Sequence, residues 1–279
     1  MLGVAVNEAA TFNSSVNEIG TLFNGTAAEV DALKGKIQSY GSDSVFSLES
    51  ITKSTYDMVS ATGDSVGAVD ALAVAEKAAI VGSTDLNTSV DALTTIVNSY
   101  GLELTDSTDV MGAFIVAVQN GKTTLPELAA SIGQVSSIAA ASKVPFDDLL
   151  AAVSALTAGG IKTSEAMTTM KSLLTELASP SDELVAALGG VTLESGGLKG
   201  VMEQLGTATG GSFVEMNKLF GSIEATKAAV GLSTTAVTTF DAALKGMGDK
   251  ATVVSDNFAL MESNLDLVTQ NMQNNLTIA

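Results

Sequence analysis

The 279-residue chain contains no cysteine, histidine, tryptophan or arginine. Without cysteine it can form no disulfide and no zinc–thiolate site, and without histidine a Ser-His-Asp arrangement is impossible. Without arginine it lacks the side chain that binds phosphate and guanine through two parallel hydrogen bonds. The 13 lysines are outnumbered by 31 acidic residues, which gives a net charge of −18. We therefore expect no stable binding of nucleic acid.

Aromatic residues are scarce at 4%, although 46% of the chain is apolar, mostly Ala, Leu and Val. Small apolar side chains allow helices to approach one another closely. The sequence has no apolar run of 18 residues, and its first residues, MLGVAVNEAATFNSS, lack the basic region of a secretory signal. We therefore predict neither a membrane span nor a signal peptide in this segment.

A seven-residue rhythm of apolar residues runs through positions 1–42 and predicts one N-terminal coiled-coil helix. The apolar residues are separated alternately by three and four positions, so they form a stripe narrower than that of an ordinary globular helix. A narrow stripe favours association with other copies of the chain. An intramolecular helix pair, or one amphipathic helix on a central bundle, would give a similar pattern. The predicted self-association residues here are Phe12, Val16, Ile19, Phe23, Val30, Leu33 and Ile37.

The same rhythm returns over 251–279 and predicts a C-terminal coiled-coil helix. Its predicted self-association residues are Val254, Phe258, Met261, Leu265, Val268 and Met272. No helix-capping residue precedes the end at NNLTIA, so we expect this helix to continue in a longer protein. Even a single straight helix of the whole chain would span only roughly 420 Å.

Between these ends, residues 43–250 carry cap and stop signals that predict short helices. Thr124 and Glu127 form a capping-box pattern before an apolar face. Gly160 and Ile161 are typical of a helix end that folds back on its last turn, and Thr163 is placed to cap the next helix. The sequence around Gly101–Leu102 repeats this pattern. We therefore predict an all-α fold, an array of short helical hairpins flanked by long coiled-coil-forming helices.

Three patterns suggest chemistry, but a structural role explains each one better. The acidic pairs Asp147/Asp148 and Asp182/Glu183 fall in first helical turns, where negative charge complements the helix dipole. The glycine-rich segment 189–200 lacks the Gly-Lys-Ser/Thr ending of a phosphate-binding loop, and we interpret it as a linker. The segment 85–96 lacks the glycine and the glutamate of a calcium loop. We therefore predict no catalytic, cofactor-binding or metal-binding residue.

The segment from about Tyr56 to Gly189 resembles the core region of tail tape-measure proteins of long-tailed bacteriophages and related tail-like particles. The resemblance lies in two ordered stretches, AEKAAIVGSTDLNTSVDALTTIVNSYGLE and TTLPELAASIGQVSSIAAASKVPFDDLLAAVSALTAGGIKTSEAMTTMKSLLTELASPSDELVAALGG. The second contains the Gly160–Ile161 pair and Pro180 in the family's order. Met167 and Lys171 depart from the pattern, because the family commonly has a small residue and an arginine at these positions.

The resemblance implies a structural protein without enzymatic activity or cofactor. Such a protein sets the length of the tail tube during assembly, occupies its lumen and leaves ahead of the DNA during genome ejection. It also implies a homo-oligomer, with a trimer favoured over a hexamer, and contacts with tail-tube and tail-tip or hub proteins. The expected location is the virion, inside the tail tube or at its distal tip, and the host cytoplasm during assembly.

Two other functional classes remain open from the residues alone. A secreted or surface helical interaction module, such as a toxin or adhesin stalk, would also need coiled coils and no enzyme chemistry. A glycan hydrolase that uses a pair of acids is disfavoured, because the acidic pairs fall in helix caps and aromatic platforms for sugar are missing.

Overall fold

The computed structural model describes residues 2–262, which form helices joined by short connections and contain no β-strand. The all-α prediction is therefore confirmed. The helices group into two compact units. The first unit comprises the described residues of 1–111 and 254–279, and the second unit comprises residues 112–253. These boundaries differ from the predicted divisions at 42 and 250, because both ends of the described chain belong to the first unit.

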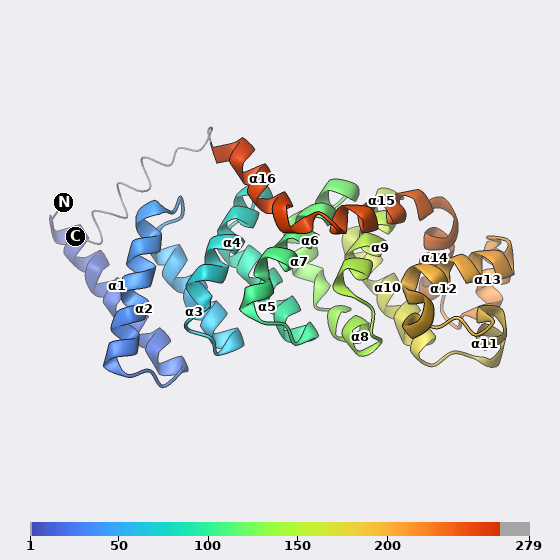
Figure 1. Ribbon diagram of the computed structural model, residues 1–279, viewed down its shortest axis with the longest axis horizontal. Helices are drawn as coiled ribbons and strands as arrows, with labels where there is room; N and C mark the ends of the chain where they lie inside the picture. The colour runs from blue at the N-terminus through green and yellow to red at the C-terminus, as the bar shows by residue number, and fades with distance from the viewer. Residues whose placement is uncertain (1, 263–279) are drawn as a thin grey trace. The chain divides into compact units, whose positions relative to one another are not determined.

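In the first unit each helix packs against the next and also against the next but one. The helices α1, α3 and α5 contact one another in turn, and α2 contacts α4, which gives the two-layered stacking of helical hairpins seen in α-solenoids (Figure 1). The helices of this unit are α1 (Leu2–Leu22), α2 (Ala27–Asp43), α3 (Leu48–Thr62), α4 (Ala68–Val81), α5 (Leu86–Tyr100) and the 3-10 turn η1 (Leu104–Asp106). Two further helices, α6 (Ser107–Asn120) and α16 (Lys250–Glu262), have residues in both units.

The predicted single helix over 1–42 is in fact two helices. The chain turns at Asn24, which has a positive φ of 52°. The Gly25 N–H donates to the Gly20 carbonyl oxygen over 3.0 Å. Thr26 and Glu29 then form a capping box at the start of α2. The apolar rhythm therefore continues across a turn, because both helices bury one face and both pack against α3.

The α3–α5 pair supplies much of the core of the first unit. Ile51 and Met58 on α3, and Leu86, Leu93 and Ile96 on α5, are fully buried. Burial of each such side chain stabilises the fold by about 1.5–3 kcal/mol. The predicted end of α5 is confirmed: Gly101 adopts the left-handed conformation, and the next N–H donates to the carbonyl of the last turn.

The second unit is built around the hairpin of α9 and α10, with α14 packed on α10 and α15 packed on α9 (Figure 1). The Phe114 and Phe146 rings meet edge to face, with centroids 5.4 Å apart. The helices are α7 (Leu125–Ile132), α8 (Ser136–Ala141), α9 (Phe146–Ala158), α10 (Thr163–Ala178), α11 (Asp182–Leu188), α12 (Leu193–Thr209), α13 (Phe213–Leu219), α14 (Ile223–Val230), the π-helical segment η2 (Gly231–Thr235) and α15 (Val237–Met247).

The end of α9 at the joint with α10 has the predicted form. Gly160 has a φ of +97°, a conformation that side chains with a Cβ rarely adopt. The Ile161 N–H donates to the Leu156 carbonyl oxygen over 3.2 Å and so closes the end of α9. The predicted cap at Thr163 is wrong. Lys162 is the N-cap residue, whereas the Thr163 hydroxyl is buried and lies 2.9 Å from the Thr123 hydroxyl.

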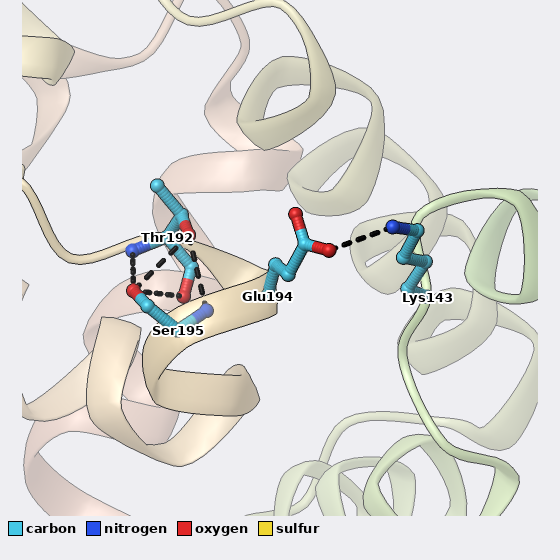
Figure 2. A network of polar contacts seen from close by, with 4 residues as sticks. All are labelled: Lys143, Thr192, Glu194 and Ser195. Carbon is cyan, nitrogen blue, oxygen red and sulfur yellow. Dashed lines mark hydrogen bonds and ion pairs between the residues drawn. The ribbon is translucent and has the colours of Figure 1, made fainter.

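The glycine-rich segment 189–200, predicted to be a linker, contains the start of α12. Thr192 and Ser195 cap this helix through reciprocal hydrogen bonds (Figure 2). The helix is kinked at Gly197, where φ is 63° and ψ is −177°, a combination available essentially to glycine alone. Gly197 therefore permits a kink inside a helix, whereas Gly189 and Gly190, with φ of 56° and 91°, lie in the connection between α11 and α12.

Candidate functional site

Most of the self-association residues predicted in the N-terminal seam line the interior of the first unit. Both α1 and α2 pack against α3, and α1 packs against α2. The buried residues are Phe12, Val16, Ile19, Leu33 and Ile37, and the half-buried ones are Phe23 and Val30. Helices of the same chain thus cover most of this seam, which is the intramolecular packing that the sequence left open. Association of copies through it stays a prediction.

A glycine allows α1 and α2 to approach closely. A Cβ atom at Gly20 would lie 2.5 Å from Cγ2 of Val30, well inside normal contact distance. Gly35 on α2, by contrast, faces open space, because a Cβ atom at this residue would have no heavy atom within 4 Å. These two glycines therefore have different roles, because Gly20 allows the hairpin to close and Gly35 does not contribute to packing.

The C-terminal seam is described only as far as Glu262. Val254 is buried, and Phe258 and Met261 are half-buried. The Nζ atom of Lys77 lies 5.6 Å from the centre of the Phe258 ring, a cation–π contact within the first unit. The remaining predicted residues, Leu265, Val268 and Met272, lie outside the described residues. Their part in self-association stays a prediction.

The acidic pair Asp147/Asp148 opens α9 as predicted, and each carboxylate also reaches another helix. The two Asp147 oxygens lie 2.8 and 2.6 Å from Nζ of Lys250. Asp148 accepts the backbone N–H of Leu198, the residue after the kink in α12. Burial, and then the neighbouring charge of Asp147, raise the pKa of Asp148. The pair therefore ties α9 to α12 and to the first residue of α16.

Glu176 caps a helix that begins more than forty residues later in the sequence. Its carboxylate accepts the Gly221 N–H over 2.6 Å, and the Ser222 N–H and hydroxyl over 3.0 and 2.6 Å. Ser222 is itself the N-cap residue of α14. Glu176 thus joins the last turn of α10 to the start of α14. Its sequence position gives no sign of this contact, because the cap comes from a different helix.

Surface ion pairs also join α12 to its neighbours in the second unit. Lys143 Nζ lies 2.8 Å from Glu194 Oε1 in the first turn of α12 (Figure 2). After the kink, Lys199 Nζ lies 2.6 Å from Asp241 Oδ1 on α15. Water and salt screen such exposed pairs, so they orient α12 more than they stabilise it.

The negative charge is concentrated in the sequence of the first unit. Residues 1–111 and 254–279 contain 18 Asp and Glu against 4 Lys, a net charge of −14. Residues 112–253 contain 13 Asp and Glu against 9 Lys, a net charge of −4. The first unit is therefore the part of the chain that repels other polyanions most strongly.

The described residues contain neither a candidate metal-binding cluster nor a helix that could span a membrane. Among residues 2–262, no three Asp or Glu side chains are close enough together to hold a metal ion. Across the same range, every helix is too short or too polar to cross a bilayer. A small pocket in the second unit presents only Thr192 as a side-chain polar group. Its lining residues are Leu177, Pro180, Val185, Leu188, Gly190, Val191, Thr192, Leu193 and Val201.

Comparisons with known proteins agree with the resemblance found in the sequence. A probable tape measure protein of Clostridium phage phiCD119 is 28% identical over 94% of this chain and 30% of its own length. A tape measure protein of Pneumococcus phage Dp-1 is 23% identical over 72% of this chain and 18% of its own length. The chain thus spans less than a third of each of these relatives. No solved structure matches it significantly.

These relatives confirm the resemblance to tail tape-measure proteins. The family model described as phage-related minor tail protein matches residues 34–221, which is 188 of the 279 residues. The match includes the α3–α5 helices of the first unit and the α9–α10 hairpin. The chain belongs to the family of phage-related minor tail proteins.

Proposed function

We propose that the chain is a segment of a tail tape-measure protein. In this role the whole protein sets the length of the tail tube during assembly, occupies the tube lumen and leaves ahead of the DNA. The observation that carries the proposal is that the relative from phage phiCD119, itself named a probable tape measure protein, aligns with 94% of this chain. The array of stacked helices supports the proposal, because such an array adds length to a protein and needs no catalytic groups.

The proposal places the protein in the virion, inside the tail tube or at its distal tip, and in the host cytoplasm during assembly. Its partners there are tail-tube and tail-tip or hub proteins. The role is structural rather than enzymatic. The Clostridium phage relative, of which the chain covers 30%, supports the expectation that this segment works as part of a longer tape.

Tail length tests the measuring role. The α9–α10 hairpin, Phe146–Ala178, contains 33 residues. If the tape holds it as helices laid end to end, deletion shortens the tail by about 50 Å, at about 1.5 Å per residue. If the stacked array is kept, the change is about 10 Å, one interhelical spacing. Electron microscopy of tails from deletion and duplication variants in the whole protein measures this, and unchanged length in both would contradict the proposal.

We also propose that copies of the chain associate in the tail, with a trimer favoured over a hexamer. Most of the described seam residues are buried within one chain. Association through them therefore requires the α1–α2 hairpin to open and exchange its apolar face with other copies. A mass measurement on the purified protein tests this, and a monomer at all concentrations would contradict it.

The charge fits a tape that shares a narrow tube with DNA. With 13 lysines, no arginine and a net charge of −18, the surface gains little free energy from releasing the counterions of DNA. We expect no DNA binding at physiological salt in an electrophoretic or fluorescence assay. Measurable binding there would count against this account of the charge.

A further inference from the structure

One buried carboxylate in the first unit, that of Glu76, holds a connection between two other helices. Glu76 lies on α4, and 7% of the residue is exposed. Its Oε2 accepts the Ser44 hydroxyl over 2.8 Å, and its Oε1 accepts the Val45 N–H over 3.2 Å. The Ser44 hydroxyl oxygen in turn accepts the Phe46 N–H over 3.0 Å. Both carboxylate oxygens are thus used to hold the connection between α2 and α3 against α4.

The charged residues on the elements packed against α4 mostly face solvent. Lys34 and Asp57 are half-buried. The exposed ones are Glu29, Asp31, Lys36 and Asp43 on α2, Glu49 and Lys53 on α3, Asp91 on α5, and Asp106 on η1. On α4 itself, Asp70 and Lys77 are exposed. Lys77 favours the ionised form of Glu76, but more weakly than burial opposes it.

We propose that Glu76 is a proton-operated clasp, which keeps the Ser44–Phe46 connection closed on α4 when protonated and favours its opening when ionised. The reason is geometric. The connection contacts both oxygens of the buried carboxyl group, so movement of residues 44–46 away from α4 would expose an ionised Glu76 to water. A protonated carboxyl is neutral and can stay buried while hydrogen-bonded to the Ser44 oxygen.

Proton linkage determines how pH changes the stability of the closed form. Burial, opposed by the Val45 N–H and then by Lys77, raises the pKa of Glu76 from its ordinary 4.5 to about 7. The closed form therefore holds a proton that the open form releases between pH 4.5 and 7. Its stability relative to the open form is greatest below this range, falls as the pH rises through it, and levels off above pH 7. The chain has no histidine, so no imidazole titrates in the same window.

The tyrosines give a specific readout for the first unit in the whole chain. Tyr40, Tyr56 and Tyr100 all lie there, and the chain has no tryptophan. Urea unfolding followed by tyrosine fluorescence at pH 5 and pH 8 gives the change in the unfolding equilibrium constant. Between these values the Glu76 linkage is expected to raise this constant by about 70-fold in the wild-type chain. Glu76→Gln cannot ionise and should lose this part of the pH dependence.

Asp70→Asn is the matched control, because it removes one negative charge from the exposed side of the same helix. It should keep the wild-type pH dependence apart from a small change in general repulsion. Equal loss of pH dependence in both variants would overturn the proposal. So would full pH dependence in Glu76→Gln.

Two measurements on the wild-type chain test the clasp even if Glu76→Gln fails to fold. Carbon-13 NMR of the Glu76 carboxyl should give a titration midpoint near 7, and a midpoint near the ordinary 4.5 would overturn the proposal. Hydrogen exchange of the Val45 amide, corrected for its intrinsic pH dependence, should speed up by about 70-fold between pH 5 and 8. An unchanged corrected rate would show that the connection does not open when Glu76 ionises.

Discussion

Replacement of Glu176 tests whether carboxylates from one helix hold the starts of others. Glu176→Ala removes the acceptor of three hydrogen bonds, from the Gly221 N–H and from the Ser222 N–H and hydroxyl. A net hydrogen bond to a charged group contributes about 1.5–3 kcal/mol when it is well buried. Water can replace part of each bond here, because Glu176 and Ser222 are half-buried and Gly221 is exposed. We therefore expect a total loss of about 2–3 kcal/mol in the free energy of unfolding of the second unit.

The assay separates the two units of the chain. Urea unfolding followed by far-ultraviolet circular dichroism reports on all helices, whereas tyrosine fluorescence reports on the first unit. Glu176→Ala should lower the midpoint of part of the dichroism transition and leave the tyrosine transition unchanged. Hydrogen exchange should become faster at the Ser222 and Ala225 amides at the start of α14.

Two further variants serve as controls for Glu176→Ala. Glu176→Gln keeps one oxygen acceptor and loses the charge, so its effect should fall between those of wild type and Glu176→Ala. Glu183→Ala removes an exposed acid from the first turn of α11 and should change stability by less than about 0.5 kcal/mol. The reasoning is refuted if Glu176→Ala also costs less than this, because water would then replace the carboxylate without loss.

Three other substitutions follow from the backbone and from burial. Gly160→Ala should destabilise the second unit by about 1–2 kcal/mol in urea unfolding by circular dichroism, because of its positive φ; no loss would contradict the described joint. Gly20→Ala should destabilise the first unit by about 1–3 kcal/mol through overpacking, whereas Gly35→Ala should stabilise it by up to about 1 kcal/mol; tyrosine-monitored unfolding should show these opposite signs. Burial and the charge of Asp147 raise the pKa of Asp148, so the stability of the second unit should fall as the pH rises above the ordinary carboxyl pKa. Asp148→Asn should reduce this fall, as measured by circular dichroism. An unchanged pH profile would argue against a buried carboxyl.

Local signals in the sequence predicted much of the middle of the fold. The capping box at Thr124–Glu127 and the helix ends at Gly101 and Gly160 each depend on a few neighbouring residues. The first-turn positions of Asp147 and Asp148 follow from the same local rules. Such features could be predicted because their geometry is complete within one turn of the chain.

Other features depend on contacts that no short stretch of sequence contains. The apolar rhythm over 1–42 continues across the turn at Asn24. Helices stacked within one chain and helices of different chains bury apolar residues at the same spacing, so the rhythm alone does not distinguish them. The Thr26–Glu29 capping box was the local signal for this turn. The partners of Glu176 and Lys250 lie 45 and 103 residues away in the sequence, so only the tertiary fold identifies them.

The return of α15 along α9 has a mechanical consequence for the second unit. Residues 237–247 lie against 146–158, and Lys250 is paired with Asp147 at the start of α9. Tension applied to the chain after residue 253 therefore loads this last segment before it reaches the α9–α10 hairpin. We therefore expect the unit to open at α15 before the α9–α10 hairpin that α15 covers.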